Sequence, residues 1–318
     1  MADLEVITMG RVSVDLYPEQ IGVPLAEVKT FSKSLGGSAT NVAVAAARLG
    51  HRSSVITSVG DDGFGLYVRA ALEGFGVDAR FVGTDPVLRT PLAFCEIFPP
   101  DDFPLLFYRE PKAPDSNIGP EELDLEEISS VPLFWVTGTG LSEEPSRGAT
   151  LEALGARSGG ITVIDLDYRP MLWESREETE RWYREALKHA TVAVGNQEEV
   201  EVAVGTGDPH ESSAALLDLG LDLAVVKRGP EGVLARTEEG VAEAPPIEVE
   251  IVNGLGAGDA FGGALCHRLL LGWDPERTIR IANAAGAIVA SRLACADDMP
   301  TAREVEELLE GSAGAQGV

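Results

Sequence analysis

The distribution of apolar residues along the chain predicts strands that alternate with helices. Largely apolar runs of the length found in buried parallel strands occur at 4–9, 54–58, 133–137, 161–165, 191–194 and 223–227. Stretches with helical periodicity lie between them or follow them, among them 42–49, 67–75, 177–189 and 279–293. This alternation favours an α/β fold in which helices cover both faces of a mostly parallel central sheet.

Two segments interrupt the alternation. Residues 12–34 alternate loosely, and residues 92–110 form two strand-like runs joined by a Pro-Pro-Asp-Asp turn. We expect the two excursions to form a small β-sheet lid outside the main sheet. Since open strand edges need covering, we also expect two lids to pair in a homodimer. The lid belongs to one domain over residues 1–310, followed by a flexible tail over 311–318.

Composition narrows the function. The 318 residues can bury a large core, and their formal net charge of −27 argues against partners such as nucleic acid or an anionic membrane surface. No apolar run reaches the length of a membrane span, and the N-terminus does not resemble a signal peptide. The three cysteines are far apart in the sequence, which fits a reducing cytoplasm.

A glycine-rich stretch near the C-terminal end carries the strongest chemical signal. It reads Asn253-Gly254-Leu255-Gly256-Ala257-Gly258-Asp259, and a helical pattern follows. Amides of Gly256, Ala257 and Gly258 at a helix N-terminus could bind an anion. Asp259 would repel that anion unless it takes a proton from a hydroxyl that attacks phosphorus. The alternative is a helix-capping Asp after a flexible loop, and spacing alone does not decide.

A second glycine loop precedes an alanine-rich helical stretch. Gly36 and Gly37 would let a ligand approach the backbone, and Asn41 offers a donor and an acceptor. An ordinary helix cap explains the loop equally well. Asp15 stands in an apolar strand context, either as a surface-facing residue or as a ligand of substrate hydroxyls.

Further candidates lie where predicted strands end. Asp165-Leu-Asp167-Tyr-Arg169-Pro follows a strand at the edge where α/β sheets bind ligands. Asn196 and Glu199 have the spacing of a helix capping box, and the same spacing suits a water-mediated magnesium site. Lys227 precedes a glycine turn and is one of the few cations placed beside one.

These motifs together resemble one family. Gly36–Asn41 and Gly256–Phe261 are similar to the two signatures of the ribokinase-like (PfkB) carbohydrate kinases. Asn196-x-x-Glu199 resembles the magnesium-linked element of that family, and Lys227–Gly232 resembles its nucleotide-side turn. The similarity runs from residue 4 to about residue 305. It implies a three-layer ribokinase-like fold and an ATP-dependent kinase that uses Mg²⁺. The rival from another class is a non-catalytic sugar or nucleotide sensor.

The resemblance also implies roles for individual residues. Asp259 would be the catalytic base, beside an anion hole of Gly256, Ala257 and Gly258. The residues implied to bind the substrate are Asp15, Gly36, Gly37 and Asn41. Those implied to bind the nucleotide are Lys227, Gly229, Gly232, Gly256, Gly258 and Asn283. Asn196 and Glu199 are implied to hold magnesium through water.

Within the family, three stretches (10–18, 107–115 and 252–259) are most similar to the kinases that phosphorylate 5-dehydro-2-deoxy-D-gluconate in myo-inositol catabolism. The alternatives are a 2-keto-3-deoxygluconate kinase, which the run at 165–170 also resembles, and a fructokinase. A sugar acid needs local cations, and Arg109 and Arg169 are placed to hold a carboxylate, with Lys112 as a third candidate. These cations could instead pair with the abundant surface acids.

One position departs from the family pattern. The second signature usually begins Asp-Thr, where the Asp helps to hold a monovalent cation, and here it begins Asn253-Gly254. Dependence on a monovalent cation is therefore left open.

Overall fold

The computed structural model of the chain describes residues 3–272 and 274–315. Within them, a nine-stranded sheet has the order β13-β12-β11-β10-β9-β8-β1-β4-β5. All neighbours from β11 to β5 run parallel, and β12 and β13 add an antiparallel edge. The strands are β1 (Val6–Met9), β4 (Ser53–Gly60), β5 (Val82–Asp85), β8 (Leu133–Thr137), β9 (Ile161–Asp165), β10 (Val192–Asn196), β11 (Leu223–Lys227), β12 (Val233–Thr237) and β13 (Gly240–Ala244).

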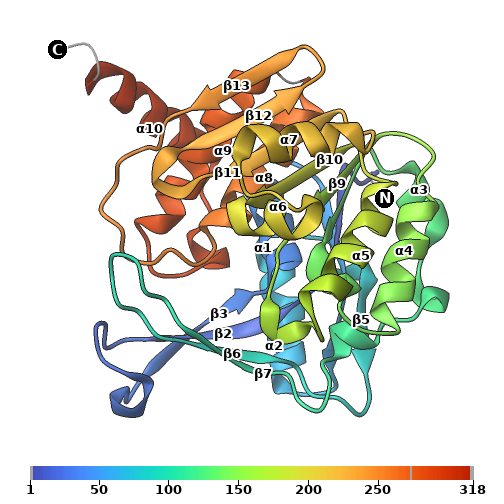
Figure 1. Cartoon of the computed structure of the whole chain (residues 1–318). Helices are drawn as coiled ribbons and strands as arrows, with labels where there is room; N and C mark the ends of the chain where they lie inside the picture. The colour runs from blue at the N-terminus through green and yellow to red at the C-terminus, as the bar shows by residue number, and fades with distance from the viewer. Residues whose placement is uncertain (1–2, 273, 316–318) are drawn as a thin grey trace.

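Helices cover both faces of this sheet (Figure 1). One core lies beneath α1 (Ser38–Arg48), α2 (Gly63–Gly74), α8 (Ala257–Leu270), α9 (Pro275–Ala290) and α10 (Ala302–Ala315). The opposite core lies beneath α3 (Leu125–Ser130), α4 (Ser146–Gly155), α5 (Arg176–Leu187), α6 (Gln197–Val204) and α7 (Pro209–Asp218). The predicted three-layer α/β/α architecture is confirmed.

Strand β8 shows why short apolar runs make this sheet. Successive side chains of a strand point to opposite faces. Leu133 and Trp135 accordingly enter the core beneath α1 and α8, whereas Phe134 and Val136 enter the other core. A strand buried on both faces needs an apolar residue at every position, so its sequence shows no polar alternation.

Small residues bring α1 and α8 together. A Cβ atom on Gly263 would overlap Ala45, and one on Gly262 would lie 2.8 Å from the Trp135 ring. The alanine-rich pattern of α1 therefore serves close helix packing. This packing places the N-termini of α1 and α8 at the same edge of the sheet, which matters for the site.

The predicted lid is present as a separate four-stranded sheet with the order β3-β2-β6-β7. Its strands lie below the main sheet in Figure 1. They are β2 (Ser13–Pro18), β3 (Phe31–Gly36), β6 (Leu92–Cys95) and β7 (Leu105–Tyr108). Strand β7 is apolar on both faces: Leu105 and Phe107 line a pocket, while Leu106 and Tyr108 are exposed.

Some elements differ from the sequence-based expectation. The sequence pattern did not predict β5, β13 or α7. Helix α10 continues to Ala315, past the tail boundary expected at 310, and 316–318 lie outside the described residues. In the described part of the chain, no helix is both long and apolar enough to span a membrane.

Candidate active site

A pocket opens where the lid meets the carboxyl ends of the central strands. It is lined by residues that come from distant parts of the chain, including Asp15, Gly37, Asn41, Arg169, Gly256 and Asp259. The fold therefore brings six of the predicted site residues together. Ligands of open α/β sheets bind at this edge.

Asp259 lies in the first turn of α8, and both of its carboxylate oxygens accept hydrogen bonds from α1. Ser38 Oγ donates to Oδ1 at 2.8 Å, and Asn41 Nδ2 donates to Oδ2 at 2.7 Å. The residue at the N-cap of α8 is Gly256, so Asp259 is not the capping residue of the alternative interpretation. Burial raises the pKa of the Asp259 carboxyl, and the donors from Asn41 and Ser38 oppose that rise.

The N-terminus of α8 has the backbone shape expected of an anion site. Gly256 adopts a left-handed φ of 80°, and a Cβ atom there would lie 2.5 Å from Cys295 Sγ. A Cβ atom on Gly258 would instead lie 3.4 Å from Lys227 Nζ, an ordinary contact. Gly256 is therefore required by the fold. Gly258 keeps open the space between the helix terminus and the Lys227 ammonium.

Lys227 ends β11 and faces this space. Among the described residues, the structure shows no hydrogen bond or ion pair made by its ammonium group. Burial lowers the pKa of Lys227, but the nearby carboxyls of Asp165 and Glu199 raise it by more than burial lowers it, so the net shift is upward. Asp165 is itself buried, which raises its pKa to about 8. The result is a charged, unengaged cation next to a helix N-terminus.

The glycines before α1 are needed by their neighbours. A Cβ atom on Gly36 would overlap the Asp15 carboxyl, and one on Gly37 would overlap the Arg11 carbonyl oxygen. Asp15 Oδ1 accepts a 2.6 Å hydrogen bond from Ser13 Oγ, and burial raises the pKa of Asp15 to about 6. The loop is thus more than an ordinary helix cap, because it makes room for a buried carboxylate that faces the pocket.

The candidates for nucleotide binding lie further along the same edge. Gly229 and Gly232 both have positive φ in the turn after β11. On α9, Asn283 Nδ2 donates to Pro245 O at 2.8 Å. Asn196 and Glu199 form a complete capping box on α6, with bonds of 2.9 and 2.7 Å. Nothing in that geometry tests the magnesium role, and the described residues contain no cluster of three or more metal-ligating side chains.

The three cationic residues predicted to bind a substrate carboxylate differ in their surroundings. Arg169 lines the pocket and is 40% exposed. Arg109 pairs with the buried Asp115, whose Oδ2 also accepts from Val12 N, and it is not part of the pocket lining. Lys112 donates to Glu144 O. For Arg109 and Lys112, the structure favours the alternative of pairing within the protein.

Comparison with known proteins identifies the family. The family described as pfkB family carbohydrate kinase matches residues 3–302. The chain belongs to this family. It is 34% identical to a 5-dehydro-2-deoxygluconokinase from Geobacillus kaustophilus over 96% of this chain and 94% of the relative. It is an ATP-dependent carbohydrate kinase.

Solved structures of other kinases share the fold. An aminoimidazole riboside kinase from Salmonella enterica, complexed with aminoimidazole riboside and an ATP analogue, superposes with a TM-score of 0.80 at 27% identity, covering 96% of this chain and 99% of that one. A fructokinase from Vibrio cholerae with fructose, ADP and calcium bound has a TM-score of 0.83 at 27% identity, covering 96% and 99%.

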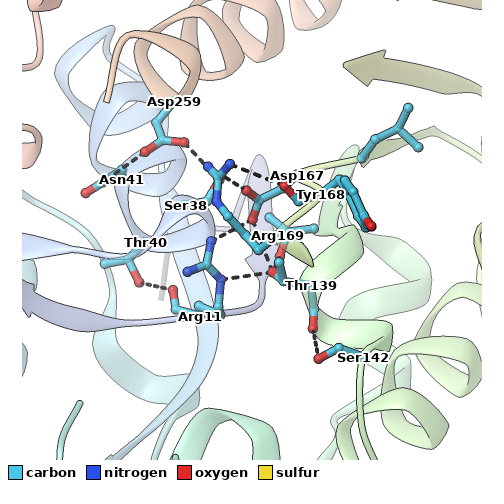
Figure 2. A network of polar contacts seen from close by, with 12 residues as sticks. Arg11, Ser38, Thr40, Asn41, Thr139, Ser142, Asp167, Tyr168, Arg169 and Asp259 are labelled. Carbon is cyan, nitrogen blue, oxygen red and sulfur yellow. Dashed lines mark hydrogen bonds and ion pairs between the residues drawn. The ribbon is translucent and has the colours of Figure 1, made fainter. Parts of the chain in front are cut away.

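The structure of this PfkB kinase also reveals pocket residues that sequence reasoning missed. Ser38 bonds to Asp259, and Ser13 bonds to Asp15. Arg11 follows β1, lines the pocket and pairs with Asp167 (Figure 2). Its position directly after an apolar strand was the available signal, and it applies equally to many other residues.

Asn253, the departure from the family pattern, is fully buried. Its Nδ2 donates to Leu293 O at 2.7 Å, and its Oδ1 accepts from Leu255 N at 3.0 Å. Both ends of the amide are therefore satisfied within the protein. A carboxylate could accept the Leu255 bond but could not donate to a carbonyl.

Proposed function

We propose that this kinase transfers the γ-phosphoryl group of ATP to the terminal hydroxyl of 5-dehydro-2-deoxy-D-gluconate, giving the 6-phosphate. The observation that carries the proposal is one pocket that contains both a held carboxylate, Asp259, and an arginine, Arg169, next to an open helix N-terminus. The relatives named 5-dehydro-2-deoxygluconokinase support this choice of substrate.

Asp259 would accept the proton of the substrate hydroxyl as that hydroxyl attacks phosphorus. The hydrogen bonds from Ser38 and Asn41 hold its carboxylate in one orientation, so no reorganisation is needed during the reaction. The amides of Gly256, Ala257 and Gly258 would stabilise charge on the transferring phosphoryl group, and Lys227 would hold the phosphates.

The sugar would lie between Asp15, Gly36, Gly37, Asn41 and the lid. The buried Asp15 carboxylate can accept hydrogen bonds from sugar hydroxyls, and Leu105 and Phe107 of β7 would cover the sugar and exclude water. Gly229, Gly232 and Asn283 would contact the nucleotide. Mg²⁺ would neutralise phosphate charge, and Asn196 and Glu199 would reach it only through water. The open α8 terminus and the unengaged Lys227 ammonium fit a bound triphosphate.

The test is to incubate the purified protein with ATP and Mg²⁺ and to identify the product. We expect ADP release that depends on the acid, with the phosphate located at C6 by NMR. Turnover of ATP without any acceptor, or no turnover with any sugar, would contradict the kinase assignment of the site. Phosphorylation of 2-keto-3-deoxygluconate in preference would select the alternative acid kinase.

We also propose that two lids pair to form a homodimer in the cytoplasm. The outer face of the lid carries an aromatic row of Phe31, Phe94 and Tyr108, with successive ring centroids 5.4 Å apart. Leu106 and Tyr108 on the edge strand β7 are 48% and 58% exposed. An exposed apolar edge strand is a surface that proteins usually cover.

Light scattering at micromolar concentration should report twice the mass of the 33.6 kDa chain. The double substitution Leu106→Lys, Tyr108→Lys should shift the protein to monomer, because it places like charges on the edge strand. A wild-type monomer at that concentration would remove the dimer from the account and leave the lid itself untouched.

A further inference from the structure

Two arginines that line the pocket, Arg11 and Arg169, pair with one buried carboxylate, Asp167. Arg11 Nη2 pairs with Asp167 Oδ2 at 2.8 Å, and Arg169 Nη2 pairs with Asp167 Oδ1 at 3.0 Å. Figure 2 shows the Asp167 carboxylate between the two guanidinium groups. Asp167 therefore pairs with two guanidinium groups at once, while the carboxyl groups of Asp15 and Asp259 also line the pocket.

The carboxylate of Asp167 is firmly held. Thr139 Oγ1 donates to Asp167 Oδ2 at 3.1 Å and accepts from Arg11 Nε at 3.0 Å. Asp167 is 3% exposed and has a φ of 35°, a left-handed conformation that is uncommon for residues other than glycine. Such strain persists where the surroundings over-determine it, commonly at functional sites.

Arg11 has donor capacity left over. Its Nε and Nη2 are engaged by Thr139 and Asp167, and among the described residues its Nη1 makes no hydrogen bond. The side chain is only 10% exposed and lines the pocket, with the Phe107 ring centroid 5.9 Å from the guanidinium carbon. Arg11 therefore brings unengaged N–H groups to the lining of the pocket.

We propose that Arg11 is the residue that selects a substrate carrying a carboxylate, and that Asp167 is a positioning residue that holds Arg11 and Arg169 ready for it. This inference rests on the proposed sugar-acid function and names the side chain that enforces it. A substrate carboxylate would accept charge-assisted hydrogen bonds from the free N–H groups of Arg11, whereas a hydroxyl group of a neutral sugar would accept only weaker ones.

An alternative role for Arg11, as a counter-charge for the acids of the pocket, predicts a different effect of its removal on activity. Asp15 and Asp259 also line the pocket, and Arg11 could serve only to offset their charge. In that case its removal would impair every substrate to the same extent, because both acids act on the hydroxyl groups that acidic and neutral sugars share. The two roles are separated by comparing one acid with its neutral counterpart.

The experiment measures kcat/KM of Arg11→Met for 5-dehydro-2-deoxy-D-gluconate and for the analogue in which a CH₂OH group replaces the carboxylate. Loss of a charged hydrogen bond should lower the value for the acid by roughly 10- to 100-fold, mainly through KM. The value for the neutral analogue should change by no more than about threefold. Arg11→Lys, which retains the charge, should recover part of the loss.

Arg147→Met is the matched control, because Arg147 is similarly buried (13% exposed) and pairs with Glu178 at 2.9 Å outside the pocket. It should leave the ratio of acid to neutral activity unchanged. If Arg11→Met is too unstable to assay, Arg11→Met with Asp167→Asn removes both charges and should show the same selective loss.

Equal losses for the acid and the neutral analogue would overturn the role of Arg11 and leave the proposed function standing. A wild-type enzyme that does not phosphorylate the acid would overturn both. An acid-specific loss in Arg11→Met that is absent from Arg147→Met would establish the selection.

Discussion

The two ends of the pocket are built in different ways. The proposed phosphate end is one continuous stretch of backbone, Gly256 to Asp259, in which Gly258 lies next to the Lys227 ammonium; the opposite end is the proposed sugar end. The sugar end consists of side chains from separate elements, with Asp15 on β2, Asn41 on α1 and Arg11 after β1. Backbone amides bind any phosphate, whereas individual side chains can be tuned to one sugar. In the proposed account, phosphate binding therefore rests on backbone groups, and the choice of sugar rests on individual side chains.

The largest effect should come from the residue where the two ends meet. Asp259→Asn should lower kcat by about 10²–10⁴, the usual range for loss of a general base, because the amide cannot accept the substrate proton. ATP affinity should stay near that of the wild type, since the α8 amides are unchanged. Steady-state kinetics and calorimetric titration with ATP would check both. A variant that keeps most of its kcat would show that another group takes the proton.

The glycines of the phosphate end should separate into a functional and a structural position. Gly258→Val should lower kcat by about 10²–10³, the range seen when an oxyanion site is impaired, because the side chain would obstruct the phosphate. Tm should change little, because a Cβ atom there would make only an ordinary contact of 3.4 Å with Lys227 Nζ. Gly256→Val should lower Tm as well, because the left-handed φ is strained and the side chain would collide with Cys295. Thermal unfolding and kinetics of both variants are the measurements. Unchanged turnover in a stable Gly258→Val variant would remove the anion hole from the account.

At the proposed sugar end, the buried charge of Asp15 should lower the free energy of unfolding at neutral pH. Its folded pKa of about 6 lies above the ordinary 3.8, because burial disfavours the charged form. This destabilisation is therefore fully present above about pH 6, and it disappears as the pH falls toward 3.8 and the carboxyl group becomes protonated. Asp15→Asn should raise the free energy of unfolding at pH 8 by up to about 3 kcal/mol, and the gain should disappear near pH 4.

Urea unfolding of Asp15→Asn and wild type at both pH values tests this. The same variant should bind sugar more weakly, since the amide is a poorer acceptor. A gain of equal size at both pH values would contradict the assignment of the cost to the Asp15 charge.

The same contrast explains what the sequence could predict. Apolar runs predict the strands of the central sheet other than β5 and β13, and small residues account for the packing of α1 on α8. The Gly256–Asp259 motif is contiguous in the sequence. Strand β13 was not predicted, because its residues Gly-Val-Ala-Glu-Ala are mostly exposed at the sheet edge and form no run of large apolar side chains. Helix α7 was also not predicted. Its capping residue Asp208 and its first residue Pro209 are helix-start signals that were available in the sequence.

The sequence could not identify which arginine is free to bind a substrate carboxylate. Arg109 was favoured because it ends a lid strand, yet it forms an ion pair with Asp115, six residues further along the chain. Arg11 meets Asp167 only because β1 and β9 both end at the same edge of the sheet, on either side of β8. Which cation is left with free N–H groups depends on such tertiary contacts.

The central claim is that the sugar end selects an acid, and direct competition tests it. Equimolar 5-dehydro-2-deoxy-D-gluconate and fructose are supplied together with limiting ATP and Mg²⁺, and the two phosphorylated products are quantified at early times. Their ratio equals the ratio of the kcat/KM values. The account predicts that the 6-phosphate of the acid is the dominant product by at least about tenfold, the value of one charged hydrogen bond. A majority of phosphorylated fructose would contradict it.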